Sequence, residues 1–231
     1  TGTDKVGGFI GQINSGQIVA ISNTYSTGAV SGSTNVGGFI GVNSSSGTAI
    51  TKSFFDTDTS GRTNGYASTT GSGITGLYAG CFGTCGTTNI TNATNIGTGV
   101  TPHNLSVMNT YSNASIGNWC TTAGASGSIS NTILTSSIAP NFSWFIFEGN
   151  TRPMLMSEYS TNIKSAHALQ LAATTLGANY TLGADIDLNA GMTNKSEVWG
   201  TNRNASTGKG FVPIGPGTFD GTAGTSFSGT F

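Results

Sequence analysis

Short apolar clusters return at a fixed interval along the first sixty residues. The run VGGFIG that begins at Val6 recurs unchanged thirty residues later, at Val36. Within one period the apolar residues lie at 6–10, 18–25 and 29–30, and the Ser, Gly, Asn and Thr residues between them favour turns. A period of this length is typical of stacked structural repeats. Three short strands per period predict one coil of a parallel β-helix.

The spacing of the repeat also predicts which side chains meet. One coil cannot bury its inward side chains alone, so we expect Phe9 to stack on Phe39 and Ile10 on Ile40, with backbone hydrogen bonds between coils. The many glycines permit turns and close approach of backbones. The fold class that follows is all-β, a right-handed parallel β-helix (solenoid), with handedness taken from the usual twist of strands.

One segment departs from the strand pattern. Ser165 is a suitable N-cap, and Gly177 is a suitable residue to end a helix. Between them, apolar residues recur at the spacing of one helical face: Leu169, Ala172, Ala173 and Leu176. The pattern predicts one short α-helix near 165–176 that caps or braces the stack.

The repeat resembles a known family. The two VGGFIG strands, followed by IVAISNTYSTGAVSG at 18–32, resemble the GLUG-type repeats of secreted exoproteins of the filamentous-haemagglutinin type. SFFDTDTSGRTNG at 53–65 and WFIFEGNTRPML at 144–155 resemble segments that close such repeat blocks. The resemblance supports the right-handed β-helix and implies a bacterial surface adhesin.

The same resemblance implies two repeat blocks. Residues 1–159 are interpreted as the end of one β-helical block, made of coils at 1–52, an irregular insertion at 53–130 and closing strands at 131–159. Residues 160–231 are interpreted as the start of a second block. Its next strands are expected at GFVPIG (210–215) and FSGTF (227–231).

The composition narrows the classes of partner. Only 7% of the residues are charged, against roughly 25% in an ordinary globular domain, and the formal net charge is -1. Eight Lys and Arg residues spread along the chain do not form the basic surface that neutralises phosphates, so we expect no nucleic-acid partner. No apolar run reaches the roughly 18 residues of a membrane-spanning helix, so we expect no membrane insertion.

The three cysteines are Cys81, Cys85 and Cys120. The spacing of the first two differs from the C-x-x-C of zinc and thioredoxin-like sites. We expect at least one disulfide among the three, with the pairing left open. A metal site that recruits His103 as the fourth ligand is the alternative.

One segment resembles the first half of a calcium-binding loop. Asp56, Asp58 and Ser60 place oxygen atoms at positions 1, 3 and 5, and Gly61 follows at position 6. Where the bidentate Glu is required, at position 12, the chain has Ala67. The alternative is a hydrogen-bonded turn rich in Asp and Thr. No cofactor is expected, and calcium is the one ion that the sequence leaves open.

Candidate catalytic residues are few. Asp56 with Asp58, and Asp185 with Asp187, stand two residues apart, so each pair would face one side of a regular strand. The Asp185 pair fits an exposed edge equally well. His167 falls in the expected helix and His103 in an expected loop, which does not indicate a Ser-His-Asp triad. We expect no catalytic residues and no enzyme.

The function expected is a structural and adhesive segment of a large secreted bacterial surface exoprotein, at the cell surface or outside the cell. Its expected partners are copies of itself or adjoining modules joined end to end in a fibre, because open terminal coils need to be covered. Surface carbohydrate and host cells are further expected partners. Two alternatives remain: a polysaccharide lyase or hydrolase, and an ice-binding solenoid suggested by Thr57 and Thr59.

Overall fold

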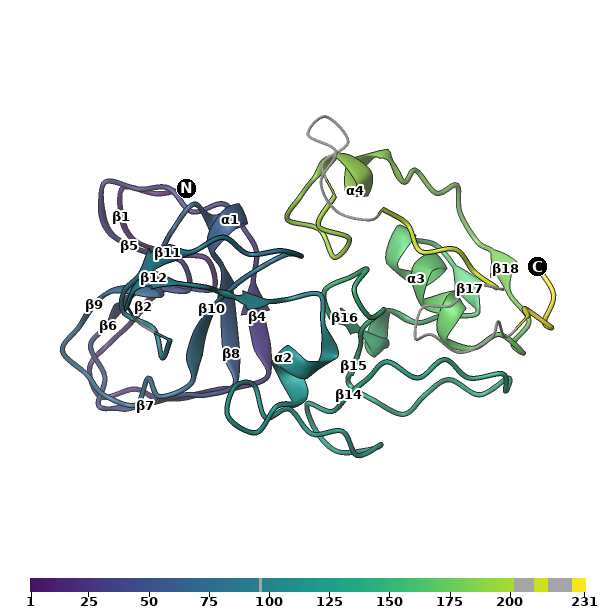
Figure 1. The fold of residues 1–231 in the computed structure, drawn as a ribbon, viewed down its shortest axis with the longest axis horizontal. Helices are drawn as coiled ribbons and strands as arrows, with labels where there is room; N and C mark the ends of the chain where they lie inside the picture. Colours follow the sequence, from purple (N-terminus) through teal and green to yellow (C-terminus); the bar gives the residue numbers. More distant parts are fainter. Residues whose placement is uncertain (96, 202–209, 216–225) are drawn as a thin grey trace. The chain divides into compact units, whose positions relative to one another are not determined.

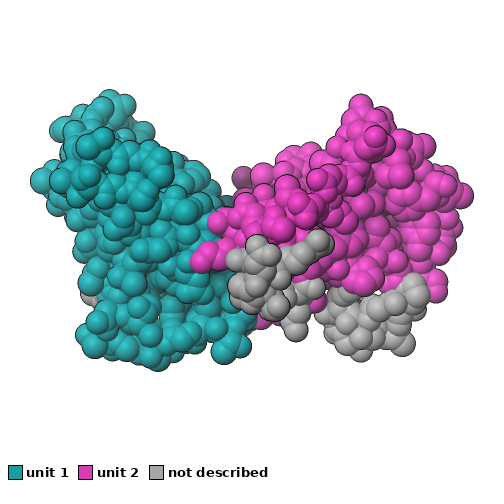
Figure 2. All heavy atoms as spheres, turned by 90° about the horizontal axis from the view of Figure 1, so that it is seen from above, with its two compact units in different colours: residues 1–105, 109–119 teal, residues 106–108, 120–231 magenta. Residues whose placement is uncertain are grey.

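The computed structural model describes residues 1–95, 97–201, 210–215 and 226–231. The chain divides into two compact units, which Figure 2 colours separately. Unit 1 contains residues 1–105 and 109–119, and unit 2 contains residues 106–108 and 120–231. The boundary predicted at residue 159 separates two repeat blocks, whereas these units are defined by contacts within each unit. The predicted boundary is therefore not tested and stays a prediction.

Two successive repeats open unit 1, and each contains four short strands rather than the three expected (Figure 1). Every strand of the first repeat pairs in parallel with its counterpart in the second. The predicted register is confirmed, because Val6 lies opposite Val36 and Ile10 lies opposite Ile40. The strands of the first repeat are β1 (Asp4–Gly7), β2 (Ile10–Ile13), β3 (Ile18–Ile21) and β4 (Thr24–Ser26), and those of the second are β5 (Thr34–Gly37), β6 (Ile40–Asn43), β7 (Gly47–Ile50) and β8 (Ser53–Asp56).

Turns at equivalent positions divide the apolar clusters. Asn23 and Lys52 precede β4 and β8 and both adopt the left-handed conformation, with φ of 54° and 52°. Asparagine tolerates this conformation better than most residues. The third expected strand, at 29–30, is absent, although Val30 is buried and its N–H donates to the carbonyl of Ser60. One apolar cluster of the sequence therefore becomes two strands, and another provides one buried side chain, Val30, outside the strands.

The glycines of the repeated strand allow two layers to approach closely. A Cβ atom added to Gly37 would overlap the carbonyl oxygen of Ile40 and lie 2.6 Å from Cα of Tyr66 and 2.9 Å from the nitrogen of Ala67. Real Cβ atoms do not make such contacts with rigid backbone, because interiors are already close-packed. Glycine at this position is therefore required by packing.

Stacking continues into residues predicted to be an irregular insertion. β9 (Tyr66–Thr69) pairs with β6, and β10 (Leu77–Cys81) pairs with β8, both in parallel. β13 (His103–Asn104) then adds to β10. β11 (Thr88–Ile90) and β12 (Gly97–Val100) form a separate antiparallel pair. The repeat identity ends at residue 41, whereas the pairing extends to residue 104.

The core of unit 1 lies between these layers. Phe9 stacks on Phe39 with ring centroids 4.9 Å apart and planes 9° from parallel, as the repeat spacing predicts. A second aromatic group joins Phe54 and Tyr111, the latter in α2 (Met108–Ser112), to Trp119. The indole N–H of Trp119 donates to the backbone carbonyl of Lys52 at 2.8 Å. The principal cluster consists of Ile13, Ile21, Phe39, Ile40, Ile50, Phe55, Leu77, Ala79 and Ile90.

Unit 2 has fewer strands and more helical turns. Its first sheet joins three strands, of which the middle one pairs in parallel on one side and antiparallel on the other. Two further strands form a parallel pair. In chain order the elements are β14 (Ile129–Ser130), β15 (Trp144–Phe145), β16 (Met154–Leu155), η1 (Met156–Glu158), β17 (Asn162–Ile163), α3 (Ala166–Leu171), η2 (Ala172–Thr174), β18 (Thr181–Leu182) and α4 (Asn189–Thr193).

The helix predicted near 165–176 is present but shorter. Ser165 is its N-cap, and the Ser165 hydroxyl accepts from the Ala168 N–H at 3.1 Å. α3 ends at Leu171 and continues as the 3₁₀ turn η2, so Gly177 does not end it. The Gly177 N–H instead donates to the carbonyl of Ser136. Leu171 and the adjoining residues of η2 are buried, so the helix is part of the core of unit 2.

The prediction of a right-handed parallel β-helix with one helix is wrong. In the described part of the chain the strands form seven separate sheets of two to four strands, with parallel and antiparallel pairs, and no solenoid runs through the chain. The described residues of the expected strands at 210–215 and 227–231 are not in strands. The physical reason is that only residues 6–41 carry the exact repeat. In unit 2 the apolar core includes residues of short helices and turns as well as of two-residue strands.

Candidate functional site

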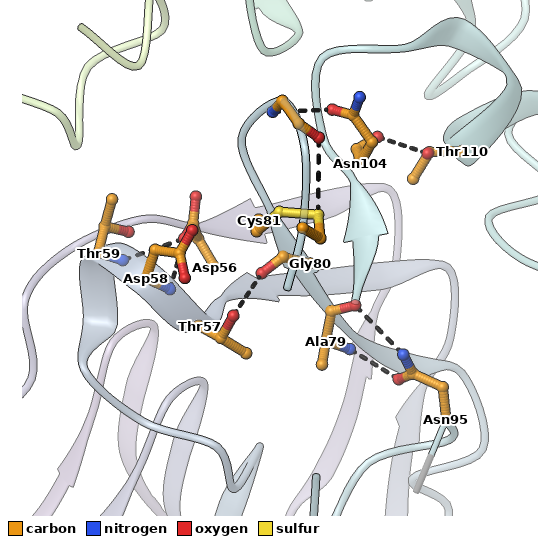
Figure 3. The surroundings of a disulfide bond; sticks show 12 residues. Asp56, Thr57, Asp58, Thr59, Ala79, Gly80, Cys81, Asn95, Asn104 and Thr110 are labelled. Carbon is orange, nitrogen blue, oxygen red and sulfur yellow. Dashed lines mark hydrogen bonds between the residues drawn. A yellow bond between two sulfur atoms is a disulfide. The ribbon is translucent and has the colours of Figure 1, made fainter. Parts of the chain in front are cut away.

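Two residues of the calcium hypothesis, Asp56 and Asp58, lie at the N-terminus of a short helix in unit 1 (Figure 3), and Ser60 is the last residue of that helix. Asp56 ends β8 and is fully buried. Its Oδ1 accepts from the N–H of Asp58 at 2.9 Å and from that of Thr59 at 3.0 Å, which caps α1 (Thr57–Ser60). Gly61, with φ of 67°, ends this helical turn. The arrangement is the hydrogen-bonded turn that the sequence offered as the alternative.

These hydrogen bonds do not show whether Asp56, Asp58 and Ser60 bind calcium. The hydroxyl of Ser60 accepts from the Arg62 N–H at 3.2 Å. Among the described residues, no group of three or more His, Cys, Asp or Glu side chains is arranged to hold a metal ion. The assignment of calcium to Asp56, Asp58 and Ser60 therefore stays a prediction.

Cys81 and Cys85, the two cysteines closest together in the sequence, form a disulfide beside this turn (Figure 3). Cys81 ends β10, and its Cα lies 5.8 Å from that of Cys85. The side-chain oxygen of Asn104 accepts from the Gly83 N–H at 3.1 Å and so supports the loop that the disulfide closes. Cys120 stands outside this pair, in unit 2, and its Sγ accepts from the Thr122 N–H at 3.4 Å.

The structure separates both pairs of aspartates. Asp56 is buried in β8, whereas Asp58 is exposed in α1, so the two do not face one side of a strand. Asp185 and Asp187 lie outside the strands, between β18 and α4. They line different cavities. The expected same-side geometry is therefore absent from both pairs.

His103 lies in β13 rather than in a loop. Its ring meets Tyr78 edge to face, with centroids 5.6 Å apart. Burial lowers the pKa of His103 below the ordinary value for histidine, because the protein interior disfavours the charged imidazolium.

The second histidine lies in a cavity that the sequence did not predict. This cavity, within unit 2, has a volume of about 310 Å³. That volume is in the lower part of the range typical of small-ligand pockets. Its lining combines three carboxylates with one imidazole and one indole: Glu158, Asp187, Glu197, His167 and Trp199, with Ser165, Ala166, Ala190 and Gly191.

His167 stands between two glutamates in this cavity. Its Nδ1 lies 2.9 Å from Oε2 of Glu158, and its Nε2 lies 3.1 Å from Oε2 of Glu197. The ring also meets Trp199 edge to face, with centroids 5.4 Å apart. The hydrogen bond to Glu158 raises the pKa of His167 above its ordinary value more than any other interaction, and Glu197 adds to this. Partial burial opposes the rise.

Buried hydrogen bonds hold the walls of the cavity. The indole N–H of Trp199 donates to Oε1 of Gln170 at 2.8 Å, and the backbone of Val212 exchanges two further hydrogen bonds with the same amide. Arg152 is fully buried, and its Nη1 donates to the carbonyls of Lys195 and Glu197 at 3.1 and 2.5 Å. The segment that carries Glu197 is therefore anchored by its backbone independently of its carboxylate.

This arrangement can store a proton and can accept hydrogen bonds from a ligand. Carboxylates accept from hydroxyl or amine groups, and a histidine between two of them can exchange a proton with either. No periodic pattern in the sequence predicts the group, because Glu158, His167 and Glu197 come from three different segments. The spacing in the sequence paired Asp187 with Asp185 instead of with the residues of this cavity.

Two other cavities lie in unit 2 and are mainly apolar. The larger, about 860 Å³, contains Leu182, Asp185 and Phe231 in its wall. The other, about 450 Å³, contains Leu134, Ile138 and Phe142. Neither has more than one titratable side chain among its lining residues, so the His167 cavity is the better candidate for chemistry.

Comparison of the chain with protein-family models, with curated proteins and with solved structures finds no match. No helix in the described ranges is both long enough and apolar enough to cross a bilayer.

Proposed function

We propose that this chain is a structural and adhesive segment of a large secreted bacterial surface exoprotein, in which it is one module or subunit of an extracellular fibre. The observation that carries the proposal is the outer edge of the first repeat in unit 1. Among the described residues, β1 to β4 pair only with strands of the second repeat. Their other edges present backbone groups to which a further strand can bind.

Exposed apolar side chains accompany these edges. Phe9 has 46% of its surface exposed and Ile18 has 92%. β2 and β3 contain no charged residue and no proline, the features that commonly block strand addition at an edge. Burying one side chain of this size stabilises an association by roughly 1.5 to 3 kcal/mol. The resemblance of the VGGFIG strands to exoprotein repeats supports the same proposal.

Sedimentation velocity and electron microscopy test the assembly. We expect the unaltered chain to form concentration-dependent assemblies, and Ile18→Lys to abolish them, because an exposed charge at the edge disfavours pairing. Ile138→Lys is the matched control, since Ile138 is 75% exposed but lies in unit 2. A chain that stays monomeric at every concentration, or equal effects of the two substitutions, would contradict the fibre.

Adhesion requires a separate measurement. We expect the chain to bind surface carbohydrate or whole cells above the level of an inert protein of similar size. Glycan arrays and cell-adhesion assays measure this, with Ile18→Lys included to separate adhesion by single chains from adhesion by assemblies. Binding no stronger than that of the inert protein would remove the adhesive half of the proposal.

The His167 cavity favours a second candidate function, cleavage of polysaccharide. Glycoside hydrolysis commonly uses two carboxyl groups, one as acid and one as base or nucleophile, and Glu158 and Glu197 flank one cavity. Release of oligosaccharides from a broad polysaccharide panel, lost in Glu197→Gln and retained in Asp185→Asn, would support this candidate. No release from any member of the panel would exclude it.

A further inference from the structure

The two glutamate contacts of His167 favour one protonation state of its ring. A neutral imidazole carries one N–H, whereas the imidazolium carries two. Both ring nitrogens of His167 lie within hydrogen-bond distance of a glutamate oxygen, at 2.9 and 3.1 Å. Only the imidazolium can donate to both. In the neutral ring, a lone pair would face one of the two carboxylates, and that contact would be repulsive.

The contacts join three segments of unit 2. Glu158 is the last residue of η1, His167 lies in the first turn of α3, and Glu197 follows α4. Asp187 adds a third carboxylate to the cavity, and the residues that line it include no Lys or Arg. The imidazolium is therefore the one cationic group among the lining residues, and its loss leaves three carboxylates in one cavity with no cation beside them.

We propose that Glu158, His167 and Glu197 form a pH-sensitive clamp, which holds the Glu197 side chain in the wall of the cavity when His167 is protonated (closed) and releases it when His167 is neutral (open). In the closed state Arg152 also donates to the carbonyls of residues 195 and 197. The opening frees the Glu197 carboxylate and loosens the backbone beside Lys195, while the core of unit 2 persists.

The direction of the pH dependence follows from the raised pKa of His167. A group whose pKa is higher in the closed state stabilises that state fully below its ordinary pKa of about 6.5. The stabilisation is lost as the pH rises through the higher value. The clamp is closed in mildly acidic solution and open in alkaline solution.

Nitrogen NMR of the histidine rings tests the proton count in the intact chain. His103→Gln leaves His167 as the single histidine, since the sequence contains two. We expect both ring nitrogens of His167 to be protonated at about pH 6.5 and to titrate above that value. Glu158→Gln should lower the midpoint, because the hydrogen bond to Glu158 contributes most to the raised pKa, and Asp185→Asn, outside the cavity, should leave it unchanged. A midpoint at or below the ordinary value would overturn the clamp.

Limited proteolysis tests the opening. Lys195 is exposed and lies two residues before Glu197. Cleavage after Lys195 is measured relative to cleavage after Lys5 of unit 1 in the same digest, which cancels the pH dependence of trypsin. We expect the relative rate to rise with pH, with the same midpoint as the NMR titration. The whole rise should be about tenfold for each pH unit by which the pKa of His167 in the closed state exceeds its pKa in the open state. In His167→Gln the rate should be high at every pH.

The indole N–H resonance of Trp199 provides a second measure that needs no variant at His167. It should shift with the same midpoint, because the two rings are in contact. If His167 titrates above the ordinary value but neither the Trp199 resonance nor cleavage at Lys195 changes with it, His167 carries a proton without acting as a clamp, and the proposal is wrong.

Discussion

Replacing Gly37 by alanine should strongly destabilise unit 1. The added methyl group would overlap the carbonyl oxygen of Ile40 and would lie 2.6 Å from Cα of Tyr66. These atoms belong to the backbone of β6 and β9, so they cannot rotate away as a side-chain end would. Overpacking in a core costs about 1 to 3 kcal/mol, and contact with two backbone segments puts this substitution near the upper limit, at about 3 kcal/mol.

Urea unfolding followed by the indole resonance of Trp119 measures the change. That indole donates to the backbone of Lys52, so its resonance reports on folded unit 1. A loss of about 3 kcal/mol lowers the midpoint by roughly 1 to 2 M for a unit of this size. Gly28→Ala is the matched control, because no atom lies within 4 Å of its added methyl. It should raise stability by up to about 1 kcal/mol, since alanine restricts the unfolded chain.

Equal midpoints for Gly37→Ala and Gly28→Ala would refute the reasoning. That result would mean that the layers can separate without cost at this position, and that the glycines of the VGGFIG run are not explained by packing. A midpoint for Gly37→Ala within error of the unaltered chain would have the same meaning.

Three further results are expected. Asp56→Ala should lower the free energy of unfolding of unit 1 by about 1 kcal/mol, because α1 loses its N-cap, and urea unfolding checks this. Non-reducing peptide mapping should recover Cys81 joined to Cys85, and Cys81→Ser should cost about 2 kcal/mol, since the disulfide closes a short loop. The stability of unit 1 should fall as the pH falls below about 6.5, because His103 has a lowered pKa and resists protonation in the folded state. The slope should vanish in His103→Gln, and an unchanged slope would contradict the assignment.

The sequence predicted pairing only where the residues repeat. Ile10 and Ile40 are opposite each other because identical strands bury identical side chains in the same register. The next layer keeps the pairing but changes the spacing. Ser53 lies opposite Thr24 and also opposite Leu77, so the offset falls from 29 residues to 24. No residue identity marks that change, and the segment was therefore interpreted as irregular.

The His167 cavity shows a different limit. Ser165, as the expected N-cap, predicted where the helix begins. It therefore also placed His167 in the first turn of that helix. The two glutamates reach it through tertiary packing, one from each of two other segments. Single-residue patterns carry no signal for such contacts. Spacing in the sequence favoured Asp185 with Asp187, whereas the fold places Asp187 with Glu158 and Glu197.

The parallel pairing of successive repeats also determines how unit 1 folds in time. The first contact between the repeats, such as Val6 with Val36, closes a loop of about thirty residues and costs about 3 kcal/mol of chain entropy at 25 °C before any strand is stable. Once it forms, β2, β3 and β4 are already held near their partners, and each closes only a short segment. We therefore expect the first pairing to be the slow step of folding, with the other strands following in rapid succession.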